Sequence, residues 1–332
     1  MNDTNFCRRS WFCWFVMLCV AGSGWRASAE EPSPSESEIL RWTVDGQRRE
    51  AIVFLPSNAN AQVDSQANSQ VSAEADSVQP VVFVFHGHGG TAKRMSQLGF
   101  STLWPEAIVV CPQGLPTPTG RDPKGERSGW QTKSSRTSRG AVANGGNRDL
   151  KFFDVMMQSI LQDHRGDPKQ VFVTGHSNGG GFTYCLLAHR ADKLRAIAPS
   201  AAGAGALRDL RPGSARQSGS DKASAKVTPI PVLHVAGKSD AIVAYKIQER
   251  TIRALCTYWG LEPTPSPIQA SKTLQGKEFT AKPGLTETPD TSQDAAVRSS
   301  NGRVVFVTHP GGHRYHRETP EAVVRFFKSV GK

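Results

Sequence analysis

Short runs of consecutive apolar residues alternate along this chain with longer segments in which apolar residues recur every three or four positions. The short runs predict strands at residues 81–85, 107–110, 171–174, 194–198, 232–235 and 304–307. The longer segments predict helices over residues 150–161, 180–189, 244–255 and 318–330. The last helix opens with Thr319-Pro320 as a cap and first-turn pair. Continuous apolar strands that alternate with helices predict an α/β fold, a mainly parallel sheet covered on both faces.

Two extended runs at 39–44 and 50–55 flank Asp45-Gly46, which is typical of a tight hairpin turn. We therefore expect an antiparallel hairpin at the N-terminal edge of the sheet. Three polar stretches without a periodic apolar face are expected to be loop inserts, near residues 57–79, 208–226 and 263–300, the last with a short strand near Phe279. The pattern predicts one domain over residues 30–332 rather than two.

The first 29 residues have the features of a secretory signal peptide. Arg8 and Arg9 precede an apolar run that starts at Trp11, and Ala27-Ser28-Ala29 follows as an A-x-A cleavage site. The apolar run is shorter than the roughly 20 residues that span a bilayer. We therefore predict cleavage after Ala29, a secreted or periplasmic protein and no stable membrane insertion after cleavage. A retained N-terminal anchor is the alternative.

Charge and cysteine content narrow the classes of function. The formal net charge is +11, but the basic residues are scattered and no nucleic-acid-binding motif accompanies them, which favours a solvated surface over a nucleic-acid interface. Signal cleavage leaves Cys111, Cys185 and Cys256, too few for a disulfide framework in a chain of this length. Cys111 and Cys185 fall in a predicted strand and helix, where buried thiols are expected. Three cysteines allow at most one disulfide within the chain, and the sequence does not decide whether it forms.

The central chemical motif is G-x-S-x-G from Gly175 to Gly179, directly after the strand at 171–174 and before the helix at 180–189. In this context the serine occupies a strained strand-to-helix turn with its hydroxyl exposed. The two glycines lack the Cβ atoms that would collide with the neighbouring strand and helix. We predict Ser177 as a nucleophile, with an incidental serine in a glycine-rich turn as the alternative.

A serine hydroxyl is a weak nucleophile until a base takes its proton and a third group orients that base. In α/β hydrolases the chain order is serine, acid, histidine. Asp240 follows the strand at 232–235, and His313 follows Gly311-Gly312 beyond the strand at 304–307. Both are expected beside Ser177 at the carboxyl edge of the sheet. Asp240 is thus the candidate acid, with a turn or helix-capping role as the alternative.

The histidine assignment has competitors, because His309, His313 and His316 lie close together. The two preceding glycines favour His313 as the base, His316 is the next candidate, and His309 before a proline is more typical of a structural residue. Three histidines, together with the H-x-H at His86 and His88, also suggest a metal site. No carboxylate completes a recognised ligand spacing in the 309–316 run, so we expect no metal.

Acyl transfer also needs hydrogen-bond donors aimed at the developing oxyanion. One donor in α/β hydrolases is the main-chain N–H of the residue after the nucleophile, here Asn178, and the other comes from an early glycine-rich loop. That loop is H-G-H-G-G at residues 86–90, with the main chain of His88 as the predicted donor and Gly87 as the alternative. A phosphate-binding loop is disfavoured because G-x-x-x-x-G-K-[ST] is absent. Trp130 is a candidate substrate-binding wall, with surface packing equally compatible.

Taken together, these motifs resemble those of the secreted polyhydroxybutyrate depolymerase and feruloyl esterase group of the α/β-hydrolase superfamily. That group shows a similar H-G-x-x-G loop, a serine elbow with paired glycines and a G-G-H histidine loop, and the resemblance runs from about residue 41 to the C-terminus except for the inserts. It implies the α/β-hydrolase fold, activity on aryl, acetyl or hydroxyalkanoate esters and no cofactor. Two segments depart from the group's pattern. The chain has Arg314-Tyr315-His316 where an aromatic and a proline are usual, and Ala-Gly-Lys-Ser-Asp at Asp240 where H-G-x-x-D is usual.

Because of these departures, the sequence predicts a small-molecule or polymeric ester as the substrate without identifying which ester it is. Carboxylesterase/phospholipase-like and dienelactone-hydrolase-like enzymes share the serine elbow. A prolyl-oligopeptidase-like peptidase is a further alternative, because such triads cleave esters and amides. A non-catalytic exported binding protein is a third class, disfavoured because every catalytic role has a candidate residue. Neither acyl-chain preference nor oligomeric state is indicated.

Overall fold

A computed structural model describes residues 37–56, 78–132, 146–205, 207, 229–281 and 302–331. The strands are β1 Ser37–Val44, β2 Gln47–Phe54, β3 Gln79–Phe85, β4 Ile108–Pro112, β5 Leu115–Pro116, β6 Ser128–Gly129, β7 Gly166–His176, β8 Ala196–Ser200, β9 Val232–Gly237, β10 Ser266–Gln269, β11 Gln275–Thr280 and β12 Arg303–His309. The helices are α1 Ala92–Ser96, α2 Phe100–Leu103, α3 Arg148–Asp163, α4 Asn178–Arg190, α5 Tyr245–Trp259 and α7 Thr319–Val330, with a 3₁₀ turn, η2 Ala191–Lys193. These residues belong to one compact unit, Ser33–Lys332.

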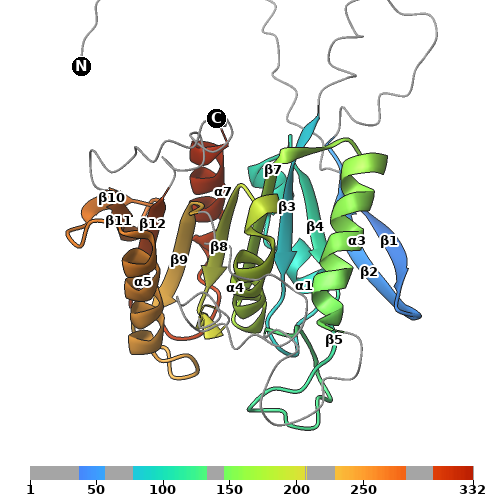
Figure 1. The fold of residues 1–332 in the computed structure, drawn as a ribbon, viewed down its shortest axis with the longest axis horizontal. Coiled ribbons are helices and arrows are strands. Elements are labelled where there is room, and N and C mark those ends of the chain that lie inside the picture. Colours follow the sequence, from blue (N-terminus) through green and yellow to red (C-terminus); the bar gives the residue numbers. More distant parts are fainter. Residues whose placement is uncertain are drawn as a thin grey trace, which may run out of the picture. The chain divides into compact units, whose positions relative to one another are not determined.

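Ten strands form one sheet in the order β1-β2-β4-β3-β7-β8-β9-β12-β11-β10 (Figure 1). The strands from β4 to β12 in this order run parallel. The antiparallel pair β1–β2 extends one edge, joining β4 through β2. Asp45 and Gly46 form its turn with φ of 49° and 74°, the left-handed conformation that a tight hairpin requires. The predicted mainly parallel sheet and N-terminal hairpin are confirmed.

The opposite edge differs from the sequence prediction. The expected loop insert over 263–300 is wrong for residues 266–280, which form the antiparallel strands β10 and β11. β11 pairs with β12 and contains Phe279, where the short strand was expected. Most β10 and β11 side chains are exposed or half-buried, so this edge lacks the apolar run that marks a central strand. Residues 57–77 and 208–228, which hold most of the other two inserts, lie outside the described residues.

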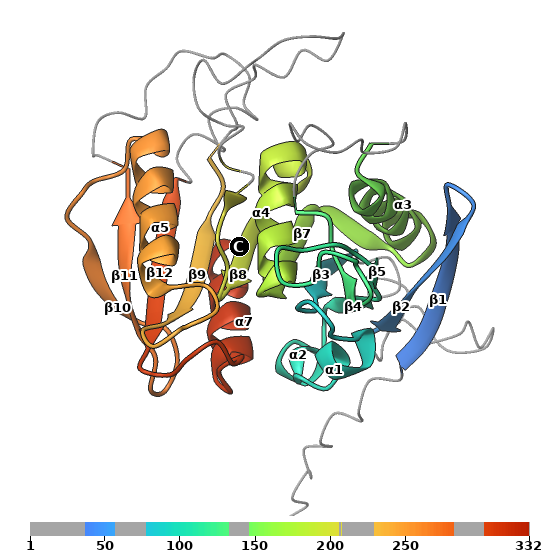
Figure 2. The ribbon, with the colours of Figure 1, turned by 90° about the horizontal axis from the view of Figure 1, so that it is seen from below.

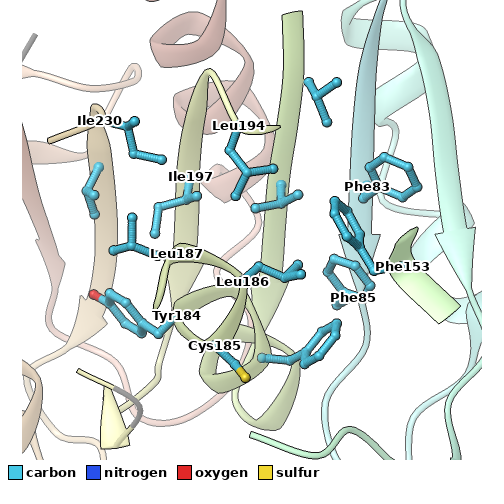
Figure 3. Close-up of a cluster of buried hydrophobic side chains, with 14 of the residues drawn as sticks. Phe83, Phe85, Phe153, Tyr184, Cys185, Leu186, Leu187, Leu194, Ile197 and Ile230 are labelled. Carbon is cyan, nitrogen blue, oxygen red and sulfur yellow. The ribbon is translucent and has the colours of Figure 1, made fainter. Parts of the chain in front are cut away.

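Side-chain alternation along the central strands builds a core on each face of the sheet. On β3, Phe83 and Phe85 belong to the core under α3, α4 and α5, whereas Val82 and Val84 belong to the core under α1, α2 and α7. Figure 2 shows these two helix layers on opposite sides of the sheet. Figure 3 shows part of the first core, where Phe83 and Phe85 of β3 lie near Phe153 of α3.

The start of helix α7 differs in part from the sequence prediction. Helix α7 has Glu318 at its N-cap position and Thr319 as its first residue, so Thr319 is not the predicted cap. Pro320 lies in the first turn as expected, where its missing N–H costs no helical hydrogen bond.

In the part of the chain that the structure describes, no helix is long and apolar enough to cross a membrane. The predicted signal peptide, residues 1–29, lies outside that part and stays a prediction.

Candidate active site

Ser177, His313 and Asp240 lie within hydrogen-bond distance of one another at the carboxyl edge of the parallel sheet. His313 Nε2 is 2.7 Å from Ser177 Oγ. His313 Nδ1 is 2.9 Å and 3.1 Å from the two carboxylate oxygens of Asp240. The three residues follow β7, β12 and β9 respectively, and parallel strands bring their carboxyl ends to one edge. The topology therefore brings together residues that are 73 and 136 positions apart.

The turn that carries Ser177 is strained and tightly packed. Ser177 has φ 55° and ψ −114°, a conformation that residues with a Cβ rarely adopt. A Cβ on Gly179 would lie 2.3 Å from the carbonyl oxygen of Phe85 and 2.5 Å from that of His86. A Cβ on Gly175 would lie 2.6 Å from the carbonyl group of Gly179. Only glycine therefore fits at both positions, as the sequence predicted.

The carboxylate of Asp240 is buried, with none of its side chain exposed. Among the described residues no lysine or arginine pairs with it; four hydrogen-bond donors do. Oδ1 accepts from the main-chain N–H groups of Ile242 and Val243, each at 2.8 Å, and Oδ2 accepts from Gln248 Nε2 at 3.0 Å. His313 is the fourth donor. Asp240 thus also makes the turn contacts that were its alternative role.

These donors keep Asp240 ionised. Burial raises the pKa of the Asp240 carboxyl, but the hydrogen bonds from His313, Val243 and Ile242 outweigh burial, so the net pKa lies below its ordinary value. An ionised carboxylate accepts only, which places the His313 proton on Nδ1 and leaves Nε2 to accept from the Ser177 hydroxyl. This is the protonation state that a general base needs.

The competing histidines lie apart from this hydrogen-bonded chain. The rings of His309 and His316 are 4.8 Å apart, and His316 Nδ1 accepts from the Glu318 N–H at 3.3 Å. Over residues 302–331 and the other described segments, neither ring is hydrogen-bonded to Ser177. In the same segments, no three His, Cys, Asp or Glu side chains lie close enough together to hold a metal ion. Cys111, Cys185 and Cys256 are all buried, and among the described residues they form no disulfide with one another.

The loop at residues 86–90 passes close to the nucleophile, because a Cβ on Gly87 would lie 3.4 Å from Ser177 Cβ. The Gly87 carbonyl accepts from His86 Nδ1 at 2.7 Å and from the Gly90 N–H at 2.9 Å. In a trans peptide the N–H points opposite to the C=O, so these bonds fix the direction of the His88 N–H. Within the described segments, the main-chain N–H groups of His88 and Asn178 donate to no protein acceptor. Asn178 is the first residue of α4, where N–H groups lack an intrahelical partner.

Contacts with the main chain hold this loop in place. His86 Nε2 accepts from the Gly114 N–H at 2.9 Å, and the His86 carbonyl accepts from the Trp130 indole N–H at 2.9 Å. The Asn178 side chain binds both main-chain groups of Trp130, accepting at 2.7 Å and donating at 3.0 Å. Asn178 therefore links the nucleophile helix to the segment that supports residues 86–90.

The predicted substrate wall at Trp130 is wrong. Trp130 is 1% exposed, with Phe85 and Phe182 against its ring at centroid distances of 5.1 Å and 5.5 Å. Its indole therefore packs in the core and contacts His86, through a hydrogen bond to the His86 carbonyl and through the His86 ring, whose centroid is 5.0 Å away. The surface-packing alternative is wrong for the same reason.

Sequence reasoning missed Gln248, which contacts Asp240 directly. It lies in α5 at helical spacing from Ile252 and Leu255, on the stripe that faces the core, and is fully buried. A polar residue on an apolar stripe was the available signal. The buried pair of Arg49 and Asp149, 2.8 Å apart, was missed too; Asp149 also accepts from the Gln131 N–H beside Trp130.

No family model matches the chain. The chain is 27% identical to feruloyl esterase D of Neurospora crassa over 50% of each protein. It is 28% identical to the bifunctional acetylxylan esterase/xylanase XynS20E of Neocallimastix patriciarum, over 30% of this chain and 13% of that protein. The matches thus span half or less of these relatives' lengths.

Among solved structures, the acetyl xylan esterase from Aspergillus awamori superposes with a TM-score of 0.55 at 15% identity, over 87% of this chain and 99% of that one. At this identity the superposition establishes the fold. The chain therefore has the α/β-hydrolase fold, and its sequence is similar to those of feruloyl and acetylxylan esterases.

Proposed function

We propose that the protein is an exported serine esterase that hydrolyses carboxylic esters through a Ser177–His313–Asp240 triad. One observation carries this proposal: the hydrogen-bonded chain from Ser177 Oγ through His313 to the buried Asp240 carboxylate, with links of 2.7 Å and 2.9 Å. Nucleophile, base and orienting acid thus have the arrangement that acyl transfer requires. The strained turn at Ser177 is typical of a nucleophile on this fold.

In the proposed reaction, Ser177 Oγ attacks the ester carbonyl carbon while His313 Nε2 takes the hydroxyl proton. Asp240 stabilises the imidazolium that forms, and the N–H groups of Asn178 and His88 bind the oxyanion. Collapse of the tetrahedral intermediate expels the alcohol, which receives the proton from His313. Water then attacks the acyl-enzyme with His313 again as base, releasing the acid and restoring Ser177.

The relatives' names favour feruloyl or acetyl esters as substrates, and the sequence motifs add hydroxyalkanoate esters to this set. The A-x-A site after the N-terminal apolar run supports export. Polymeric esters are natural substrates for an exported esterase, because polymers do not enter cells intact.

A substrate panel tests the proposal. The purified protein is assayed on p-nitrophenyl acetate, methyl ferulate, acetylated xylan, polyhydroxybutyrate and a set of peptides, alongside Ser177→Ala. We expect ester turnover that falls by about 10³-fold or more in Ser177→Ala, because the variant lacks the nucleophile. Faster cleavage of peptides than of every ester would assign a peptidase, and absence of turnover on all of them would assign a binding protein.

A further inference from the structure

A line of buried polar side chains leads from Asp240 into the core. Gln248 of α5 donates to Asp240 and places its Oε1 2.9 Å from His234 Nε2 of β9. His234 Nδ1 lies 2.7 Å from the hydroxyl of Tyr184 on α4. All three side chains are fully buried, and Figure 3 shows Tyr184 among apolar neighbours that include Leu187. A polar line through a core is costly unless each member is hydrogen-bonded, as each is here.

The chemistry of the partners fixes the direction of every hydrogen bond in this line. Gln248 Nε2 lies 3.0 Å from Asp240 Oδ2 and 2.7 Å from the Val243 carbonyl, and both are acceptors. The NH₂ end of Gln248 must therefore face them, so its Oε1 faces His234. Because Oε1 only accepts, the proton of a neutral His234 lies on Nε2. Nδ1 of the same ring then accepts from the Tyr184 hydroxyl.

The protonation states agree with this direction. Burial lowers the pKa of His234 to about 4, so its imidazole is neutral near pH 7. Burial also raises the pKa of the Tyr184 hydroxyl well above its ordinary value, so the hydroxyl keeps its proton. From Tyr184 to Asp240, each group therefore donates toward the carboxylate.

We propose that Gln248, His234 and Tyr184 are positioning residues that hold the Asp240 carboxylate in the orientation in which it binds His313. This inference rests on the proposed esterase function. Oδ1 of Asp240 is held by the N–H groups of Ile242 and Val243, whereas Oδ2 is shared between Gln248 and His313. Loss of the Gln248 donor therefore leaves Oδ2 held by His313 alone, and the carboxylate can rotate about its bonds at Oδ1. Tyr184 belongs to α4, the helix that begins directly after Ser177, so the line also connects the nucleophile's helix to the acid's loop.

Two substitutions remove links of different importance. Gln248→Met keeps the approximate volume and removes the donor to Asp240, and Tyr184→Phe removes only the terminal hydroxyl. We expect kcat on p-nitrophenyl acetate to fall 10- to 100-fold in Gln248→Met, since hydrogen bonds to charged groups have that weight, and about 2- to 5-fold in Tyr184→Phe. KM is expected to change less than about threefold, because these residues touch no substrate.

Matched controls separate positioning from stability. Thr251→Val on α5 and Thr183→Val on α4 each remove a buried hydroxyl that donates within its own helix, to the carbonyls of Ile247 and Gly179 respectively. The Thr251 hydroxyl also accepts from the Ala204 N–H at 3.4 Å. Both are expected to lower Tm while kcat stays within about twofold of wild type. Loss of a positioning residue therefore lowers kcat by more than in these controls, whereas loss of a merely structural residue lowers Tm and leaves kcat nearly unchanged.

The outcomes distinguish the two proposals. If Gln248→Met and Tyr184→Phe keep wild-type kcat while Ser177→Ala is inactive, the positioning role is overturned and the esterase stands. If Ser177→Ala keeps its activity, the proposed function itself fails. Should Gln248→Met not fold, Tyr184→Phe decides: a kcat equal to that of Thr183→Val overturns the proposal.

Discussion

The two sides of Ser177 are held by different kinds of contact. On the acid side, which comprises Asp240, His313, Gln248, His234 and Tyr184, mostly side chains bind other side chains. On the oxyanion side, which comprises residues 86–90, Trp130 and Asn178, side chains mostly bind main-chain groups, with the contact of His88 Nε2 to the Asp122 carboxylate as an exception. The acid side therefore depends on which atoms the side chains carry. The oxyanion side depends on how closely the backbone segments approach.

This difference predicts opposite sensitivities. A substitution that keeps shape but exchanges an acceptor for a donor should damage the acid side most. A substitution that adds one carbon should damage the elbow and oxyanion side most, where the space beside Gly179 is filled by main-chain oxygens. Four tests follow, from the largest expected effect to the smallest.

The largest effect is expected for Asp240→Asn on the acid side. The new amide NH₂ would face one of the four donors that the carboxylate now accepts from, so one hydrogen bond becomes a repulsion. We expect kcat to fall by about 10⁴-fold, because the wrong tautomer of the base is favoured. The control is Asp163→Asn, which removes a charge at the exposed end of α3. Equal kcat values for the two variants would contradict the account of the acid side.

The second test adds one carbon to the elbow. In Gly179→Ala the new Cβ would meet the carbonyl oxygen of Phe85 at 2.3 Å, so β3 and α4 must move apart. We expect a loss of about 3 kcal/mol in the free energy of unfolding, measured by chemical denaturation, together with reduced kcat. Gly120→Ala is the matched control, since a Cβ there meets nothing within 4 Å. A stable, fully active Gly179→Ala would show that the elbow is not tightly packed.

The third test uses pH, because each side contains a buried histidine whose pKa is lowered by burial, His234 on the acid side and His86 on the oxyanion side. The folded-state pKa of His234 is about 4, whereas the ordinary value is 6.5. Below pH 6.5 the unfolded chain binds a proton that the folded protein does not, so lower pH destabilises the fold until the folded form also titrates.

Between pH 7 and 5 this histidine should lower the free energy of unfolding by about 2 kcal/mol. Denaturation curves at the two pH values measure the decrease. In His234→Gln the decrease in the free energy of unfolding between pH 7 and 5 should be smaller by that amount. In His86→Gln the decrease should also be smaller than in wild type. A decrease in His234→Gln as large as in wild type would mean that His234 is charged in the folded protein.

The smallest effect is expected for Trp130→Phe, which removes one donor to the His86 carbonyl and keeps an aromatic ring in the core. We expect a kcat decrease of about 5- to 10-fold, the weight of about one hydrogen bond, measured on p-nitrophenyl acetate. Trp259→Phe is the control, because the Trp259 indole nitrogen has no hydrogen-bond partner among the described residues. If both variants keep wild-type kcat, the indole contact does not support the oxyanion side.

The sequence predicted the parts of the molecule whose causes are local. Asp45-Gly46 specifies its hairpin turn, and the spacing of Gly175 and Gly179 around Ser177 specifies the elbow. The approach of Asp240 and His313 to Ser177 also followed from the sequence, since each comes after a parallel strand. Chain order and strand direction were sufficient for that prediction.

The rest depends on tertiary contacts that no local pattern encodes. Trp130 lies in a loop and is buried only because Phe85 and Phe182 pack against it. Glutamine is a polar residue type that usually lies on the protein surface. Only the position of Asp240 explains why Gln248 is buried. The strands β10 and β11 lie at one edge of the sheet, where their side chains stay exposed or half-buried. These strands therefore lack the run of apolar residues by which a central strand is recognised in a sequence.

The identity of the nucleophile is tested most directly by covalent labelling. The protein is treated with a fluorophosphonate probe, and the modified peptide is identified by mass spectrometry in wild type, Ser177→Ala, His313→Ala, His309→Ala and His316→Ala. We expect one adduct, on Ser177, that is absent from Ser177→Ala, strongly slowed in His313→Ala and retained in the other two variants. An adduct that persists in Ser177→Ala, or labelling at the wild-type rate in His313→Ala, would contradict the proposed triad.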